Sequence, residues 1–283
     1  MKVKHLKAKL IPFIALIFLS SSTISETQTS TIKPEHTETY TITSKPTPTP
    51  STVRSAPTSP LKQISAHGVK VSSNSELLRP SVSQINKCAR TVLKTLKSLP
   101  KEHVSNLKTL ILTFDTAARR GLGGGDKIIL RCTNVTDTEL SQVLIHEMGH
   151  IVDSSYLTGN SSSYDLDFKD GQSNISSNDP SLDFYKISFT SESELISEYN
   201  ETDFVSGYAS SDPFEDFAET YNFYVSHPDL FLNFAKSNLL IQQKYNFMRD
   251  NVFSGKEFTK NNRTFNTSTA EIRDYDSTLL SSL

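Results

Sequence analysis

The stretch "LSQVLIHEMGHIV", residues 140–152, constrains the fold more than any other part of the chain. Thr136 and Glu139, three residues apart, form a capping-box pattern, which predicts that a helix begins just before this stretch. Its apolar residues recur at helical spacing and predict a largely buried helix: Leu140, Val143, Leu144, Met148, Ile151 and Val152. His146 and His150 stand one turn apart, so both imidazoles leave the same face of that helix and can reach one ion.

Glu147 completes the H-E-x-x-H pattern of zinc peptidases, in which the two histidines bind the metal and the glutamate is the general base. The alternative is a pair of hydrogen-bonded histidines on a buried helix beside a salt-bridging glutamate. The capped amphipathic helix following predicted strands favours the metal site. The metzincin pattern is excluded, because Asp153 and Tyr156 occupy the positions of its glycine and third histidine. For Asp153, a supporting or helix-end role is favoured over direct ligation.

Catalytic zinc needs a third protein ligand, and the stretch "DFVSGYASSDPFEDFAETYNFYV" offers one. Asp212, followed by a proline, marks a helix start there, and Glu215 and Glu219 stand one turn apart on that helix. We predict that His146, His150 and Glu215 bind Zn²⁺, and that Glu219 accepts a hydrogen bond from a ligand imidazole. The alternative for the two glutamates is a solvated acidic helix face.

The pairing of "HEMGH" with "YASSDPFEDFAE" resembles the gluzincin peptidases of the anthrax lethal factor and Pro-Pro endopeptidase type. In that group a tyrosine lies seven residues before the glutamate ligand, and Tyr208 lies seven residues before Glu215. The resemblance implies a zincin-like fold for residues 75–255, with Tyr208 as the hydrogen-bond donor to the oxyanion. The segment 156–202 is longer and more polar than is expected for members of that group. Loops of this kind commonly line a site, so the substrate specificity of the group does not carry over to this chain.

The wider pattern predicts an α+β domain: a small sheet, the active-site helix and a C-terminal helical subdomain. Apolar spacing predicts a helix within residues 79–99. Short runs rich in β-branched residues predict strands at residues 107–115 and Lys127–Cys132. The apolar residues of 227–253 predict helices that pack beneath the site.

Two other features are weaker candidates for function. The glycine-rich stretch "RRGLGGGDKIILRC" lacks the Lys-Ser or Lys-Thr pair of a phosphate loop and is interpreted as a flexible hairpin. His227 directly precedes Pro228 at a predicted helix start, where the residue before proline leaves helical geometry. A surface or capping role is therefore favoured over metal ligation for His227.

The two ends of the chain differ in composition from the middle. Residues 1–25 contain four lysines followed by an apolar run, Leu10–Leu19, which predicts a cleaved secretory signal peptide rather than an uncleaved anchor. Residues 26–74 are interpreted as a disordered Ser/Thr/Pro-rich stalk or linker, and 256–283 as a polar C-terminal tail. The protein is expected to be secreted or extracellular, with cell-surface association through the stalk left open.

Export would place Cys88 and Cys132 in a compartment where disulfides persist. A disulfide between them and two buried free thiols are equal alternatives at this point, because pairing depends on a geometry that the sequence does not give.

The formal net charge of −2 gives no basic field for nucleic acid, so the expected partner is a protein or peptide substrate. We predict an exported zinc endopeptidase whose Lys127–Cys132 strand, as an exposed sheet edge, pairs with an extended peptide. The alternatives are a stalked surface binding or adhesion module and an inactive protein with a peptidase fold. The intact set of Glu147, both histidines, Glu215 and Tyr208 favours the enzyme.

Overall fold

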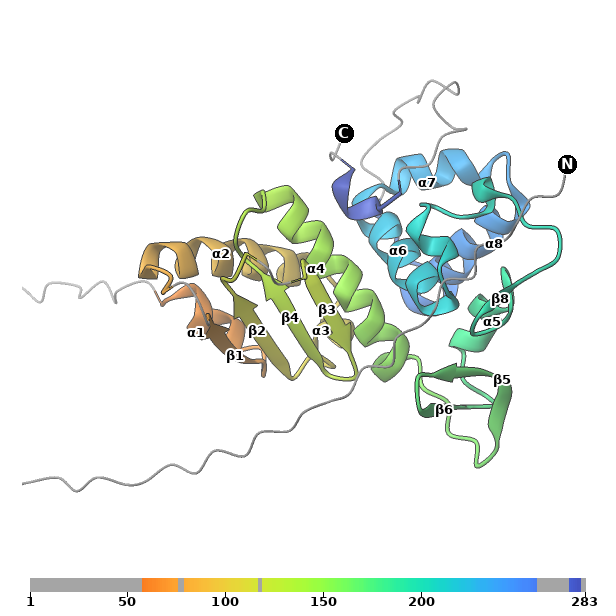
Figure 1. Cartoon of the computed structure of the whole chain (residues 1–283), viewed down its shortest axis with the longest axis horizontal. Coiled ribbons are helices and arrows are strands. Elements are labelled where there is room, and N and C mark those ends of the chain that lie inside the picture. Colours follow the sequence, from red (N-terminus) through yellow and green to blue (C-terminus); the bar gives the residue numbers. More distant parts are fainter. Residues whose placement is uncertain (1–57, 76–78, 117–118, 259–274, 281–283) are drawn as a thin grey trace, which may run out of the picture. The chain divides into compact units, whose positions relative to one another are not determined.

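The computed structural model describes residues 58–75, 79–116, 119–258 and 275–280 (Figure 1). The chain divides into two units, Met1–Arg54 and Ser55–Leu283, and the first lies outside the described residues. The predicted signal peptide and most of the predicted stalk therefore also lie outside them. In the part of the chain that is described, no helix is long and apolar enough to cross a membrane.

A four-stranded sheet of order β1-β2-β4-β3 carries the N-terminal half of the described fold (Figure 1). Its strands are β1 (Lys70–Asn74), β2 (Thr109–Thr113), β3 (Gly121–Gly124) and β4 (Lys127–Arg131). β1, β2 and β4 run parallel, and β3 pairs antiparallel with β4. The prediction that the Lys127–Cys132 strand is an exposed edge is therefore wrong: β3 pairs with its outer side, so β3 forms the edge on that side and β1 forms the other edge.

One face of this sheet forms the core of its half of the fold. Leu110, Leu112, Ile128 and Leu130 on this face are fully buried. The helices of this half are α1 (Pro60–Ser65), α2 (Val82–Ser98) and α3 (Lys101–Val104).

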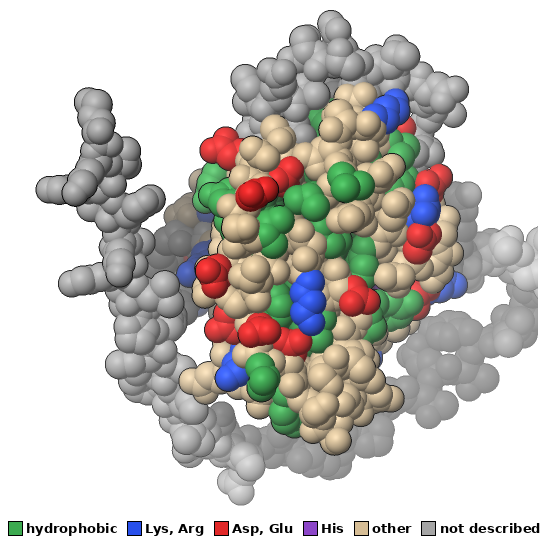
Figure 2. All heavy atoms as spheres, turned by 90° about the vertical axis from the view of Figure 1, so that its right-hand side faces the viewer, with side chains coloured by type: hydrophobic (Ala, Val, Ile, Leu, Met, Phe, Trp, Pro, Cys, Tyr) green, Lys and Arg blue, Asp and Glu red, His purple; other side chains and the backbone are tan. Residues whose placement is uncertain are grey.

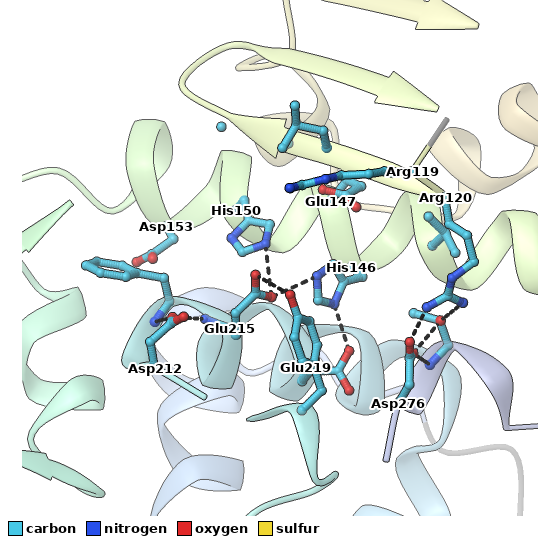
Figure 3. A pocket seen from close by; sticks show the side chains of 18 of the residues that line it. Arg119, Arg120, His146, Glu147, His150, Asp153, Asp212, Glu215, Glu219 and Asp276 are labelled. Carbon is cyan, nitrogen blue, oxygen red and sulfur yellow. Dashed lines mark hydrogen bonds and ion pairs between the residues drawn. The ribbon is translucent and has the colours of Figure 1, made fainter. Parts of the chain in front are cut away.

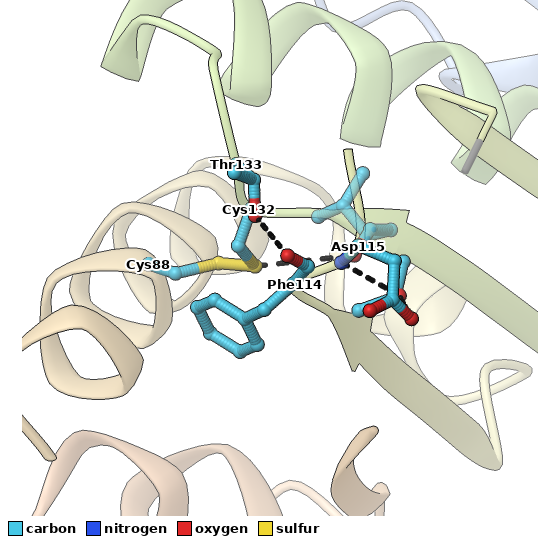
Figure 4. Close-up of a disulfide and its surroundings, with 7 residues drawn as sticks. Cys88, Phe114, Asp115, Cys132 and Thr133 are labelled. Atoms are coloured by element: carbon cyan, nitrogen blue, oxygen red, sulfur yellow. Dashed lines mark hydrogen bonds between the residues drawn. A yellow bond between two sulfur atoms is a disulfide. The ribbon is translucent and has the colours of Figure 1, made fainter. Parts of the chain in front are cut away.

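Helix α2 begins with a complete capping box formed by Ser81 and Gln84. Cys88 on α2 forms a disulfide with Cys132, which follows β4, with a Cα–Cα distance of 5.8 Å (Figure 4). The disulfide therefore joins the helix layer to the sheet.

The folded part starts earlier than residue 75, where the sequence interpretation placed it. Helix α1 and strand β1 lie inside the predicted stalk, and all five residues of β1 pair with β2. The sequence "KVSSN" of β1 shows no apolar alternation, because main-chain hydrogen bonds at the sheet edge, rather than side-chain burial, hold this strand. A pattern of apolar residues could not reveal it.

The middle of the chain carries the helix of the H-E-x-x-H pattern and a polar insertion. Helix α4 (Asp137–Ile151) packs on β3, β4 and α2, and continues into a π-helical turn, η1 (Val152–Tyr156). The insertion that follows contains β5 (Tyr164–Asp170), β6 (Ser173–Ser176), α5 (Ser181–Tyr185), β7 (Phe189–Ser191) and β8 (Glu194–Leu195). β5 and β6 form a hairpin, which Figure 1 draws at the lower right.

The C-terminal half is helical. Its elements are η2 (Glu201–Asp203), η3 (Tyr208–Ser210), α6 (Pro213–Ser226), α7 (Pro228–Ala235), α8 (Leu239–Phe247), η4 (Met248–Val252) and η6 (Ser277–Leu279). A fully buried ion pair between Lys244 and Asp216, 2.7 Å long, ties α8 to α6. On the face shown in Figure 2, acidic and basic side chains are interspersed with apolar ones.

Residues 275–280 differ from the polar tail predicted for 256–283. Ser277 is fully buried and Thr278 is 4% exposed. The segment has no apolar core pattern, because its buried groups are hydroxyls and main-chain atoms held by hydrogen bonds.

Candidate metal centre

Helix α4 brings the H-E-x-x-H residues to the centre of the fold. Thr136 caps it by accepting a hydrogen bond from the Glu139 amide at 3.1 Å. Helix α6 packs directly against α4 at Gly149, where a Cβ atom would lie 2.8 Å from the Cα of Ala218 and 3.2 Å from the Cβ of Tyr221. Only glycine allows this approach, which brings the glutamates of α6 opposite the histidines of α4 (Figure 3).

Three side chains meet between the two helices. One ligand atom each from His146, His150 and Glu215 lies within 4.8 Å of the other two. Glu215 Oε2 is 3.2 Å from His146 Nε2 and 3.5 Å from His150 Nε2 (Figure 3). Asp212 caps α6 by accepting hydrogen bonds from the amides of Phe214 and Glu215, which fixes the first turn that carries the glutamate.

These three residues fit a metal cation. Glu215 Oε2 is buried and makes no hydrogen bond of good geometry, although two imidazole nitrogens face it. If each imidazole carries its proton on Nδ1, three lone pairs point at one another, and a cation between them removes the repulsion. Two nitrogens and one carboxylate oxygen are also the ligand types that zinc takes in catalytic sites.

The electrostatics of the centre likewise favour a cation. Burial lowers the pKa of His146, but the carboxylates of Glu215 and Glu219 beside its ring nitrogens raise it more, to about 10, so they favour a positive charge there, supplied by a proton or by a metal ion. Burial raises the pKa of Glu215, but the close contacts with both histidines lower it well below its ordinary value. The carboxylate therefore keeps its negative charge inside the protein.

Glu219 lies one turn beyond Glu215 and is fully buried. Its Oε1 is 2.8 Å from His146 Nδ1, so the imidazole donates there and keeps its Nε2 lone pair for the metal. Its Oε2 accepts hydrogen bonds from Ser206 Oγ at 2.5 Å and from the Ser277 amide at 2.8 Å.

Glu147 sits in a notch made by the edge strand β3. A Cβ atom at Gly121 would lie 2.1 Å from Glu147 Oε1, and one at Gly123 would lie 2.7 Å from the Glu147 carbonyl oxygen. Burial raises the pKa of Glu147, which suits a group that must take up a proton. The interpretation of these glycines as a flexible hairpin does not include this role. Gly121 and Gly123 are two residues apart on one strand, so they lie on the same face of the sheet. This spacing is the sequence signal for a close approach by another element.

Tyr208 approaches the centre from the turn η3. Its hydroxyl donates to Glu215 Oε1 at 2.8 Å, and its ring stacks on that of His146 with centroids 6.2 Å apart. Burial, followed by the charge of Glu215, raises the pKa of Tyr208, so the phenol keeps the proton that it would donate to an oxyanion.

The other two candidate ligands lie outside the centre. Asp153 Oδ2 accepts a hydrogen bond from Tyr185 at 2.7 Å, and burial raises the pKa of Asp153 to about 7. His227 is only 7% exposed, and its Nε2 is 3.2 Å from Gln142 Oε1. His227 stands at the N-cap position of α7 without a side-chain capping hydrogen bond. Of the predicted surface or capping role, the surface position is therefore wrong, because the junction of α6 and α7 is buried against α4.

A cleft of about 710 Å³ opens onto these residues. Its lining includes Arg119, Arg120 and β3 on the sheet side, and Tyr208, Asp212 and Phe214 on the helical side. The two histidines and Glu215 also line it, so a ligand in the cleft can reach the candidate metal position.

Residues 143–275 match a protein-family model described as "Putative zinc-binding metallo-peptidase". The matched range contains the two histidines, Glu147, Tyr208 and both glutamates of α6. The match supports zinc binding and a metallopeptidase function. No curated protein matches the chain.

Proposed function

We propose that this protein is an exported zinc-dependent endopeptidase of the gluzincin type, similar to the lethal factor and Pro-Pro endopeptidase group. The convergence of His146, His150 and Glu215 within 4.8 Å, beside a buried glutamate and an open cleft, carries the proposal. The seven-residue spacing from Tyr208 to Glu215 supports the subgroup.

A bound zinc ion would lower the pKa of a water molecule and polarise the carbonyl of the scissile peptide bond. Glu147 accepts the proton of the attacking water, because its carboxylate lies in the cleft next to the ligands and has a raised pKa. Glu147 then delivers that proton to the leaving amine. In this structure the Tyr208 hydroxyl donates a hydrogen bond to Glu215. During the reaction it turns to donate to the oxyanion as negative charge develops there.

Strand β3 provides the place for an extended substrate. It is an outer strand of the sheet, and among the described residues it pairs on one side only, with β4. Its free edge borders the cleft and can form main-chain hydrogen bonds with a peptide, which is the binding mode of an endopeptidase. The peptide-binding strand is therefore β3 rather than the predicted Lys127–Cys132 strand, and the binding mode stays the same.

Export rests on the lysine-rich leader with its apolar run and on the Cys88–Cys132 disulfide, which persists in oxidising compartments. We include a protein or peptide substrate outside the cell in the proposal. The Ser/Thr/Pro-rich segment adds attachment to the cell surface through a stalk to this proposal.

Zinc content tests the proposal first. Elemental analysis of the full chain from metal-replete medium is expected to give about one zinc per chain, because three protein ligands and a water complete one tetrahedral site. Glu215→Ala is expected to lower the content, and Glu147→Gln to retain it while abolishing cleavage of a peptide library.

Three outcomes would contradict the proposal. Metal-replete parent protein without zinc would leave a stalked binding or adhesion module as the better description. Zinc binding combined with equal cleavage by the parent and Glu147→Gln would reject the general base, and zinc binding without any cleavage would favour an inactive peptidase fold.

A further inference from the structure

The C-terminal segment, residues 275–280, lies against both walls of the active site, and we call it the C-terminal clasp. On the sheet side, Asp276 contacts Arg120, and Thr278 Oγ1 accepts a hydrogen bond from Arg120 at 2.7 Å (Figure 3). The Leu280 carbonyl accepts a hydrogen bond from Gln142 of α4 at 2.7 Å.

On the helical side, the clasp contacts the elements that carry the site residues. The Tyr208 amide donates to the Tyr275 carbonyl at 2.6 Å, which holds the turn η3 in place. Ser277 Oγ accepts a hydrogen bond from Asn222 of α6 at 2.8 Å. The Ser277 amide donates to Glu219 Oε2 at 2.8 Å.

This last contact reaches the candidate metal site through one intermediate. Glu219 is fully buried, so its charge needs hydrogen-bond donors inside the protein. The clasp supplies a main-chain donor, which cannot rotate away as the Ser206 hydroxyl can. With Oε2 held in this way, Oε1 stays 2.8 Å from His146 Nδ1 and fixes the ring and its tautomer.

The clasp is itself ordered by its own first residues. Asp276 caps the turn η6 by accepting a hydrogen bond from the Thr278 amide at 2.9 Å. The same carboxylate holds Arg120, which precedes the edge strand. The position of the Ser277 amide is thus fixed from both sides of the cleft.

We propose that the C-terminal clasp is part of the metal site, and that Ser277 is a positioning residue whose main-chain N–H orients Glu219 and, through it, His146. This inference rests on the proposed zinc function. It assigns a role to a segment that is separated in the sequence by 58 residues from the glutamate that it holds.

The test replaces this one amide hydrogen. The proline Cδ takes the direction of the N–H, so Ser277→Pro removes the hydrogen bond and also displaces Glu219 Oε2 from its 2.8 Å contact. In Ser277→Pro the nitrogen has no proton, and the backbone accepts proline because Ser277 is the first residue of η6 and Asp276 is extended, with φ −138° and ψ 118°. Ser277→Ala is the matched control, since it keeps the N–H and loses only the hydroxyl contact to Asn222.

Zinc affinity is measured by competition with a chelator. Ser277→Pro is expected to bind zinc about 10- to 100-fold more weakly than the parent, as is typical when a partner of a ligand histidine is lost. Ser277→Ala is expected to stay within roughly threefold, because a neutral hydrogen bond to Asn222 does not touch Glu219. The visible absorption spectrum of the cobalt-substituted protein should change in Ser277→Pro and not in Ser277→Ala.

A double-mutant cycle separates positioning from general damage. If Ser277 acts through Glu219, Ser277→Pro should cause no further loss of zinc affinity in a Glu219→Ala background. An undiminished further loss would overturn the proposed path.

Folding of each variant is checked by circular dichroism. Should Ser277→Pro not fold, Asp276→Ala takes its place, because it frees the clasp from Arg120 without touching Glu219. Unchanged zinc affinity in the folded variant would overturn the clasp proposal, whereas a parent without zinc would overturn the proposed function instead.

Discussion

The metal centre and the polar insertion are both rich in polar side chains, but they obtain their hydrogen bonds in different ways. In the centre the partners are far apart in sequence: 73 residues separate His146 from Glu219. In the insertion they are close: Ser163 and Ser177 are 14 residues apart, and Asn160 and Asn178 are 18 apart. A change in the centre should therefore affect distant elements, whereas a change in the insertion should remain local.

The largest effect is expected where the edge strand β3 meets Glu147, the proposed general base. A methyl group at Gly121 would overlap the carboxylate of Glu147, which must rotate away. Gly121→Ala should therefore lower kcat/KM roughly a hundredfold, which is the lower end of the rate loss that follows when a general base no longer acts. Steady-state assays with a cleaved peptide measure this. Leu122→Ala, at a half-exposed position on the same strand, is the control. Equal activity of the two variants would show that the notch does not position Glu147.

The next effect concerns pH and stability. His103 is fully buried between Tyr221 and the Val252 carbonyl, and burial lowers the pKa of His103 to about 4. The unfolded chain takes up a proton near pH 6.5, but the folded chain does not until about pH 4. The contribution of His103 to the free energy of unfolding should therefore fall by about 3 kcal/mol between these pH values, and this loss should be complete below pH 4.

Urea unfolding at pH 7 and pH 4.5 measures this loss. His103→Gln should be less stable at pH 7 but show a smaller decrease with acid, because it has no titrating ring. If both proteins lose the same stability on acidification, His103 does not carry the pH dependence.

A smaller effect is expected at the contact between α4 and α6. Gly149→Ala would place a methyl group 2.8 Å from the Ala218 backbone, so the helices must separate. Overpacking of this kind should destabilise the protein by about 2 kcal/mol and also weaken zinc binding. Gly171→Asn is the matched control in the insertion: its φ is +60°, which asparagine tolerates, and nothing lies within 4 Å of its Cβ position. Chemical denaturation compares the two, and a larger cost at Gly171 would reverse the comparison.

The smallest effect is expected on the β5–β6 hairpin. Leu166 is 89% exposed, so Leu166→Ser should change the free energy of unfolding by less than about 0.5 kcal/mol. Zinc affinity should not change. A weaker zinc site in this variant would mean that the insertion is coupled to the centre, which contradicts the difference drawn between the two regions.

Much of the site was predictable because its chemistry is encoded locally. The i, i+4 spacing of His146 and His150 follows from helix geometry, as does the spacing of Glu215 and Glu219. The caps at Thr136 and Asp212 likewise act within three residues. Strands with apolar patterns, such as β2 and β4, were predictable for the same reason, whereas the polar strand β1 was not.

The sequence by itself determined which residues can bind a metal and on which helices they stand, since periodicity and capping depend only on near neighbours. Tertiary structure alone decided which strand is the edge, why Gly121 and Gly123 are glycines, and that Ser277 reaches Glu219. These features arise from contacts between segments up to 158 residues apart, such as Arg120 and Thr278. No local pattern records such contacts, because the free energy that fixes them comes from packing and hydrogen bonding across the whole domain.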